Sequence, residues 1–245
     1  MKISIIGLGW FGSALATDLA ENYKISGTTR TPEKVTLFKS KNIDAEVLLP
    51  PDRPSSELLN SDVIVLNIPP FLGQLEWFKS WQWNQASHLI FVSSTSVYGD
   101  EGISVDERTQ PFPNTENGRI LMEEENWVKT FSKYSIIRFG GLLGHNRHPG
   151  KFLSGRKNLA GGQSPVNLIH LDDTVGFTKL VIEKKLFGET FNLVHPNHPT
   201  RSEYYEKYCR DNHLPLPEFD SSRAEGKIVS SKKVTELYSF KRSIS

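Results

Sequence analysis

Three glycines near the amino terminus have the spacing of a turn that binds a dinucleotide. The segment Gly7-Leu8-Gly9-Trp10-Phe11-Gly12 follows an apolar run, Lys2 to Ile6, and opens a stretch in which Phe11, Leu15 and Leu19 recur at helical spacing. The first glycine permits a tight turn, the second lets the backbone approach a diphosphate, and the third lets helix and strand pack closely. Free N–H groups at the helix start favour phosphate. We therefore predict a nicotinamide dinucleotide site formed by these six residues.

The end of the second expected strand should decide which dinucleotide binds. NAD sites usually carry a carboxylate there for the ribose 2′-hydroxyl, whereas NADP sites offer cations and hydroxyls for a 2′-phosphate. This chain has Gly27-Thr28-Thr29-Arg30, with no carboxylate. Arg30 can hold a phosphate in a bidentate manner, and Thr29 and Thr31 can add hydroxyl donors. The pattern favours NADP over NAD, with the alternative that Arg30 is a solvated loop charge.

A serine cluster, Ser93-Ser94-Thr95-Ser96-Val97-Tyr98-Gly99, follows another apolar run. Two later segments complete a recognisable order, Arg138-Phe139-Gly140-Gly141-Leu142-Leu143-Gly144 and Ile169-His170-Leu171-Asp172-Asp173. With the glycine turn, they resemble the extended short-chain dehydrogenase/reductases, the NAD(P)-dependent epimerase/dehydratase family that acts on nucleotide sugars. The matching segments span almost the whole chain, and their order is more specific than any one of them.

The resemblance implies a set of catalytic positions. The family uses a Ser or Thr at the fifth strand, which is Ser94 here, and a Tyr-x-x-x-Lys pair at the next long helix. Aligned on that helix, Thr115 stands at the tyrosine and Arg119 at the lysine. A threonine is a poorer acid or base than a phenol, and arginine cannot release a proton, although it can grip a ribose or phosphate. Tyr98, the nearest phenol, is an alternative acid/base. The pattern resembles an atypical branch of the family with a degraded catalytic set.

Two further positions are expected beside the cofactor. Asn67-Ile68-Pro69 stands where the family often has a His-x-Ala-Ala turn, at the carboxyl end of a strand. A proline-stiffened loop without ligand contact is the alternative there. Ser93, at the end of the fifth strand, is expected next to the same ligand.

Two functions follow from these residues. The first is an NADP-dependent oxidoreductase, or an epimerase or dehydratase, for a polar substrate such as a nucleotide sugar. The second is a regulatory or sensor protein that keeps the dinucleotide site without turnover. The missing tyrosine–lysine pair favours the second, and the intact serine turn favours the first.

The elements that must position these residues alternate between strands and helices, which is typical of parallel βαβ units. The expected strands are 2–6, 23–28, 45–49, 62–67, 88–93, 135–139 and 190–194. The expected helices are 10–21, one beginning at 31–33, 71–83, 115–131, 171–184, 201–212 and 232–238. The prediction is an α/β Rossmann fold with a doubly wound parallel sheet. Residues 1–140 form the dinucleotide-binding domain, and residues 141–245 form a smaller substrate-pocket region, partly interleaved with the main sheet.

The composition limits the partners. The chain has 245 residues, a net charge of +1 and 1 cysteine, so neither nucleic acid nor an anionic membrane is an expected partner. A single cysteine fits a reducing compartment, and we expect a cytoplasmic protein. Several histidines occur after residue 144, but no spacing completes a tetrahedral metal site, and we expect no metal.

Three surface features complete the sequence predictions. The helix over 71–83 carries Trp77, Phe78, Trp81 and Trp83. The resemblance implies that this helix and the one over 115–131 pack against a second subunit in a homodimer, with internal core packing as the alternative. The run 123–125 consists of three glutamates, which we interpret as a solvated helix face. The basic loop 151–157 is either a phosphate grip or an ordinary surface cluster.

Overall fold

A seven-stranded parallel sheet forms the centre of the protein in a computed structural model, which describes residues 1–100, 102–220 and 226–244. The strands lie in the order β10-β7-β5-β4-β1-β2-β3, and all six neighbouring pairs are parallel. They are β1 (Lys2–Ile6), β2 (Lys24–Thr29), β3 (Ile43–Val47), β4 (Val63–Leu66), β5 (His88–Ser94), β7 (Tyr134–Phe139) and β10 (Glu189–Leu193). The predicted doubly wound Rossmann class is confirmed.

The strand order places a ligand crevice at a defined point of the sheet. The chain runs outward from β1 to β3 on one side and then returns to build β4 on the other side of β1. At such a reversal, the connections leave the carboxyl ends of neighbouring strands in opposite directions, and a crevice opens between them. The glycine turn follows β1, and the Asn67 turn follows β4, so both predicted cofactor segments meet at this crevice.

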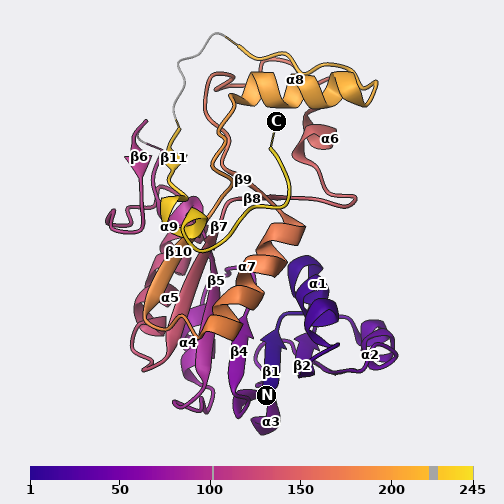
Figure 1. The fold of residues 1–245 in the computed structure, drawn as a ribbon, viewed down its shortest axis with the longest axis vertical. Coiled ribbons are helices and arrows are strands. Elements are labelled where there is room, and N and C mark those ends of the chain that lie inside the picture. Colours follow the sequence, from indigo (N-terminus) through magenta and orange to yellow (C-terminus); the bar gives the residue numbers. More distant parts are fainter. Residues whose placement is uncertain (101, 221–225, 245) are drawn as a thin grey trace.

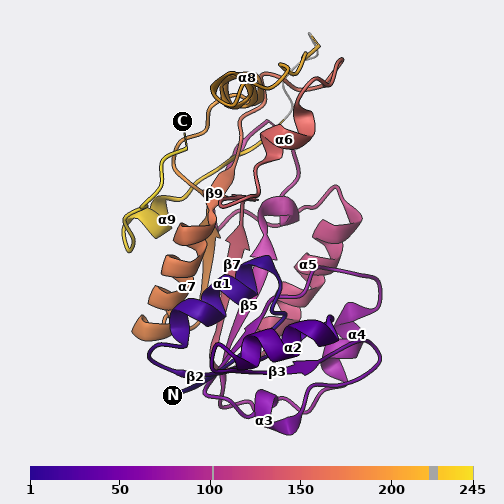
Figure 2. The same cartoon turned by 90° about the vertical axis from the view of Figure 1, so that its right-hand side faces the viewer.

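Helices cover both faces of the sheet (Figures 1 and 2). On one face, α1 (Trp10–Leu19) packs against α7 (Leu171–Lys184), and Leu15, Leu19 and Val181 share one apolar core with the sheet. On the other face, α4 (Gln74–Lys79) packs against α5 (Glu116–Val128) over a second apolar core. Two further helices, α2 (Pro32–Lys39) and α3 (Ser56–Leu59), precede β3 and β4.

The second half of the chain contributes to the main sheet and also builds a region above its carboxyl edge. Both α7 and β10 belong to the sheet layers. The upper region, at the top of Figure 1, contains α8 (Arg201–Asp211), α6 (Pro149–Leu153) and the paired strands β8 (Gly141–Leu143) and β9 (Leu168–His170). The 3₁₀ turn η1 (Thr95–Val97) directly follows β5, β6 (Ser104–Val105) pairs with β11 (Ile228–Val229), and α9 (Lys232–Thr235) contacts β10.

The aromatic helix is shorter than predicted, and its rings pack within the chain. Gly73 lies in the left-handed region with φ of 80° and begins α4, and the helix ends before Ser80. The Trp83 indole then donates to the Phe78 carbonyl at 2.7 Å, which satisfies a carbonyl near the helix end. Phe78 and Trp81 are fully buried, and Trp127 of α5 stacks on Phe78. Internal core packing, one of the two alternatives from the sequence, therefore accounts for these rings.

Candidate functional site

The glycine turn is built so that two of its glycines permit close packing and one faces open space. A Cβ on Gly7, whose φ is +109°, would lie 2.1 Å from the Asn67 carbonyl oxygen. A Cβ on Gly12 would lie 2.2 Å from the Gly7 carbonyl oxygen. A Cβ on Gly9, in contrast, would meet no heavy atom within 4 Å. Gly7 and Gly12 are thus required by the protein's own packing, whereas Gly9 leaves room for a ligand.

A cavity of about 480 Å³ lies beside this turn, between the carboxyl ends of β1, β2 and β4. Nine of the residues predicted to contact the cofactor line it, namely Gly7, Leu8, Gly9, Thr29, Arg30, Thr31, Asn67, Ile68 and Pro69. The remaining members of the turn lie differently. Phe11 is buried against Phe139, with ring centroids 4.9 Å apart, Gly12 is buried, and Trp10 is half-buried at the first position of α1.

The side chains that line the cavity give it a positive charge. Arg30 and Lys34 line it, both with exposed side chains, and its described lining contains no carboxylate. Lys34 was not among the residues predicted from the sequence. The sequence could have indicated Lys34 as a cavity residue, because α2 begins at Pro32 and a residue near the helix start faces back towards the strand that precedes it. Two cations without a carboxylate make this cavity suited to a phosphate group rather than to a sugar hydroxyl alone.

Hydrogen bonds hold the segments around the cavity in place. The Asn67 side-chain amide donates to the Gly7 carbonyl at 3.1 Å, which ties the turn after β4 to the turn after β1. The Thr28 hydroxyl accepts from the Gly7 N–H at 3.0 Å, and the Thr29 hydroxyl accepts from the Thr31 N–H at 3.2 Å. Asn67 and Thr28 therefore set the shape of the cavity.

The serine turn meets the start of α5. The Ser94 hydroxyl accepts from the Ser96 N–H at 3.1 Å and thereby begins η1. The exposed Thr115 hydroxyl accepts from the Gly118 N–H at 3.1 Å and caps α5. A Cβ on Gly118 would lie 2.3 Å from the Ser96 carbonyl oxygen, so the two turns are in close contact. The fold thus brings together the segments that carry Ser94 and Thr115. Arg119, in the next turn of the helix, is exposed.

Tyr98 lies in the core, below the serine turn. Its side chain is 1% exposed, and its hydroxyl accepts from Arg138 Nη1 at 2.5 Å. The same hydroxyl is within donating distance of the Asp106 carbonyl, at 2.8 Å, and of Asn192 Oδ1, at 3.0 Å. Burial raises the pKa of this phenol, against the opposing charge of Arg138. All the hydrogen-bonding capacity of the hydroxyl therefore goes to buried protein groups.

A buried ion pair next to Tyr98 corrects the interpretation of the glutamate run. Glu125 is 1% exposed and binds Arg138 through two contacts, at 2.9 and 2.5 Å. Glu125 also accepts from the Ser93 hydroxyl at 2.7 Å, so Ser93 points to the core. Glu124 is 0% exposed. A solvated face was therefore the wrong prediction for two of the three glutamates, because Glu125 meets partners from the distant strands β5 and β7 and Glu124 is buried next to it.

A second cavity, of about 340 Å³, lies between the serine turn and the upper region. Thr95 and Asp100 line it from the sheet side, and Arg201 and Tyr205 line it from α8. Lys227 also lines it. This side chain is 8% exposed, and its Nζ donates to the Tyr98 carbonyl at 2.9 Å and to the Asp100 carboxylate at 2.7 Å. The cavity is thus polar, and it lies at the carboxyl end of β5.

Comparison with known proteins matches this arrangement to a family. The Escherichia coli protein YeeZ is 32% identical over 260 aligned positions, which cover 98% of this chain and 94% of YeeZ. This chain belongs to the YeeZ family. A different family model, described as "NADP oxidoreductase coenzyme F420-dependent", matches residues 2–93, the segment that holds the glycine turn, Arg30, Lys34 and Asn67.

Solved structures extend the likeness of this YeeZ-family chain at the level of the fold. The UDP-glucuronic acid 4-epimerase from Bacillus cereus, in complex with NAD, superposes with a TM-score of 0.80 at 20% identity over 100% of this chain and 93% of the epimerase. A functionally unknown conserved protein from Silicibacter pomeroyi gives a TM-score of 0.77 at 20% identity, over 96% and 91% of the two chains. The predicted resemblance to epimerase/dehydratase-like Rossmann proteins is thus confirmed at the level of the fold.

Neither a metal-binding cluster nor a helix able to cross a membrane occurs among the described residues of this YeeZ-family chain. No group of three or more metal-binding side chains gathers in residues 1–100, 102–220 and 226–244. His170 and His148 instead accept from main-chain N–H groups and begin α7 and α6. None of the helices described has the length and apolar character needed to cross a bilayer. Two wider cavities elsewhere, of about 590 and 930 Å³, contain none of the predicted catalytic or cofactor residues.

Proposed function

We propose that this chain binds NADP(H) in the cavity beside the glycine turn and acts as a reductase, epimerase or dehydratase on a polar substrate. The observation that carries the proposal is the cationic lining at the end of β2, with Arg30 and Lys34 and no carboxylate in the described lining. The open space at Gly9 fits the approach of a diphosphate. When bound, the nicotinamide supplies hydride transfer.

Each segment of the cavity has a proposed task. The main chain of residues 7–12 holds the diphosphate, and Arg30, Lys34 and the Thr29 and Thr31 hydroxyls hold the 2′-phosphate of NADP. Asn67 keeps the two turns together, while Ile68 and Pro69 present an apolar wall. Leu48 and Leu49, which also line the cavity, suit the flat face of the adenine.

The substrate is proposed to lie in the second cavity, between Thr95 and Lys227. Ser94, Thr115 and Arg119 stand around the contact between the serine turn and α5, where they can hold polar groups of substrate or cofactor. Burial of the Tyr98 hydroxyl supports a structural task for that residue instead of proton transfer. A nucleotide sugar is the substrate class that we propose to test first, because UDP-glucuronic acid 4-epimerase shares the fold.

Cofactor preference provides the first experiment. The dissociation constants of NADPH and NADH are measured for the wild type and for Arg30→Ala and Lys34→Ala. Each substitution removes a charge-assisted contact and should weaken NADPH about tenfold, while NADH stays within about twofold. Arg210→Ala, which removes an exposed arginine of α8, is the control. Tighter binding of NADH by the wild type would refute the preference for NADP.

Turnover distinguishes an enzyme from a regulatory protein. The chain is incubated with NADPH and a panel of carbonyl compounds and nucleotide sugars, and consumption of NADPH or isomerisation of the sugar is followed. Turnover that Ser94→Ala abolishes supports the enzyme. Tight NADPH binding without any turnover on the panel supports the regulatory alternative.

Two further properties stay predictions, namely a homodimer through residues 71–83 and 115–131 and a cytoplasmic location. Light scattering tests the former.

A further inference from the structure

An arginine from the second half of the chain lies on the glycine turn. Residues 144–147 form a tight hairpin in which Gly144 and Arg147 exchange two main-chain hydrogen bonds, each 2.9 Å long. The hairpin follows β8 and leads to α6 in the upper region. At its end, the guanidinium carbon of Arg147 lies 5.2 Å from the centre of the Trp10 ring. Trp10 is the first residue of α1, within the glycine turn.

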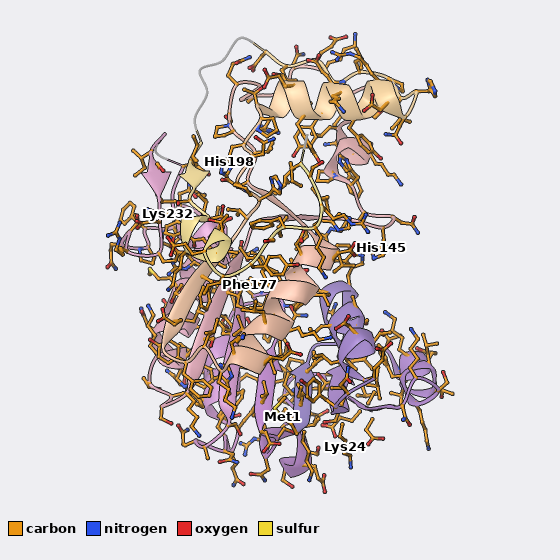
Figure 3. All side chains as sticks on the ribbon, viewed as in Figure 1. Met1, Lys24, His145, Phe177, His198 and Lys232 are labelled. Atoms are coloured by element: carbon orange, nitrogen blue, oxygen red, sulfur yellow. The ribbon has the colours of Figure 1, made fainter. Side chains whose placement is uncertain are left out.

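The hairpin is fixed relative to α1 by its neighbours. Gly144 has a φ of +130°, and a Cβ there would lie 2.7 Å from His170 Nε2, so the hairpin is packed against the start of α7. In turn, α7 packs along α1. Figure 3 labels His145, at the tip of the hairpin, beside the upper end of α7 and above α1. The packing of Gly144 on His170 and of α7 on α1 therefore holds the main chain at Arg147 near Trp10. The position of the guanidinium does not depend on the Arg147 side chain alone.

The charge of Arg147 is available to a ligand. Its side chain is exposed, and no ion pair within the described residues includes it. The nearby Asp172 is bound by Arg242 at 2.6 Å. A cation held over an indole ring gains from the negative face of the ring and loses side-chain freedom. The guanidinium is thus held in place without a carboxylate that would neutralise it.

We propose that Arg147 binds the diphosphate of the dinucleotide and that Trp10 is the platform that holds it there. This inference rests on the proposed NADP(H) site. The first N–H groups of α1 have no acceptor inside the helix, and they form the proposed diphosphate site with Gly9. A diphosphate carries two negative charges, which the partial positive charge of a helix N-terminus does not balance. Arg147 lies over Trp10, the residue that follows Gly9. Its planar guanidinium supplies a bidentate partner for the diphosphate.

The proposal separates two arginines by the part of the ligand that each recognises. The diphosphate is common to NADPH and NADH, so Arg147→Ala should weaken both about tenfold and leave their ratio unchanged. Arg30→Ala should instead change the ratio. Adenosine 2′-monophosphate lacks the diphosphate bridge, so its affinity should fall in Arg30→Ala and stay the same in Arg147→Ala.

Isothermal titration calorimetry on the full chain tests this with three probes, NADPH, NADH and adenosine 2′-monophosphate. Arg147→Gln repeats the charge loss with a side chain closer in length, and Arg210→Ala, at an exposed arginine of α8, is the matched control. Equal losses for NADPH and NADH in both Arg147 variants, with unchanged melting temperatures of the free proteins, support the proposal. Unchanged affinities in the Arg147 variants overturn it while the NADP(H) site stands. A wild type that binds neither dinucleotide overturns the proposed function itself.

Discussion

Replacement of Arg138 by methionine should be among the most destabilising single changes in this chain. Arg138 is 2% exposed, and three of its contacts end on buried partners, two on Glu125 and one on the Tyr98 hydroxyl. Methionine fills much of the volume, but among the described residues it leaves the buried Glu125 carboxylate with the Ser93 hydroxyl as its one remaining hydrogen-bond partner. Removal of one member of a buried pair typically costs about 3–5 kcal/mol in the free energy of unfolding. For a chain of this size, that corresponds to a fall of roughly 10 °C in melting temperature.

Urea unfolding followed by tryptophan fluorescence measures this loss. The double variant Arg138→Met/Glu125→Leu removes both charges and should recover about 2 kcal/mol or more of the loss, because no unpaired charge remains in the core. Lys207→Met breaks the exposed Lys207–Asp211 pair, whose side chains are 54% and 59% exposed, and is the control. It should change the free energy of unfolding by less than about 1 kcal/mol. A loss below about 1 kcal/mol in Arg138→Met would refute the assignment of this network as a structural support.

Two further predictions concern the buried acid and the glycine turn. Both carboxylate oxygens of Glu124 lack a hydrogen-bond partner within the described residues, and burial, with the charge of Glu123, raises the pKa of Glu124 from 4.5 to about 8. The folded state holds this proton more tightly than the unfolded state, so its contribution is complete below about pH 4.5 and is lost as the pH rises through about 8. The gain in melting temperature of Glu124→Gln over the wild type should therefore be larger at pH 8.5 than at pH 4.5. An equal gain at both pH values would contradict the burial of an unpaired acid. Gly12→Ala places a Cβ 2.2 Å from the Gly7 carbonyl oxygen and should lower the urea midpoint and abolish NADPH binding. Gly9→Ala meets open space at a φ of −79° and should leave the midpoint unchanged while it weakens NADPH, and the reverse order of the two variants would contradict the cavity assignment.

Local pattern was sufficient to predict the sheet and the glycine turn. The strand over 2–6 and the helix over 171–184 have the bounds that hydrophobic spacing predicted. The reason is physical: central parallel strands are apolar on both faces, and the Gly7, Gly9 and Gly12 spacing reflects contacts within one βα unit. Nine of the predicted cofactor residues line one cavity because the carboxyl ends of neighbouring parallel strands meet at one edge.

Local sequence patterns could not predict contacts between residues that are far apart in the sequence. Nothing near Glu125 in the sequence indicates Arg138, which enters from β7, or Ser93, which enters from β5. The same holds for Tyr98, whose partner Asn192 is 94 positions away. Lys227 reaches Tyr98 across 129 positions. A run of charged residues therefore does not by itself show a solvated face, because distant strands can supply buried partners for its side chains.

The most direct test of the account is a calorimetric titration of the wild-type chain with NADPH. We expect one NADPH bound per chain, with a lower dissociation constant than that of NADH, and no binding heat in Gly12→Ala. No binding of NADPH or NADH at millimolar concentration would contradict the claim that the cavity beside Gly9 is a dinucleotide site.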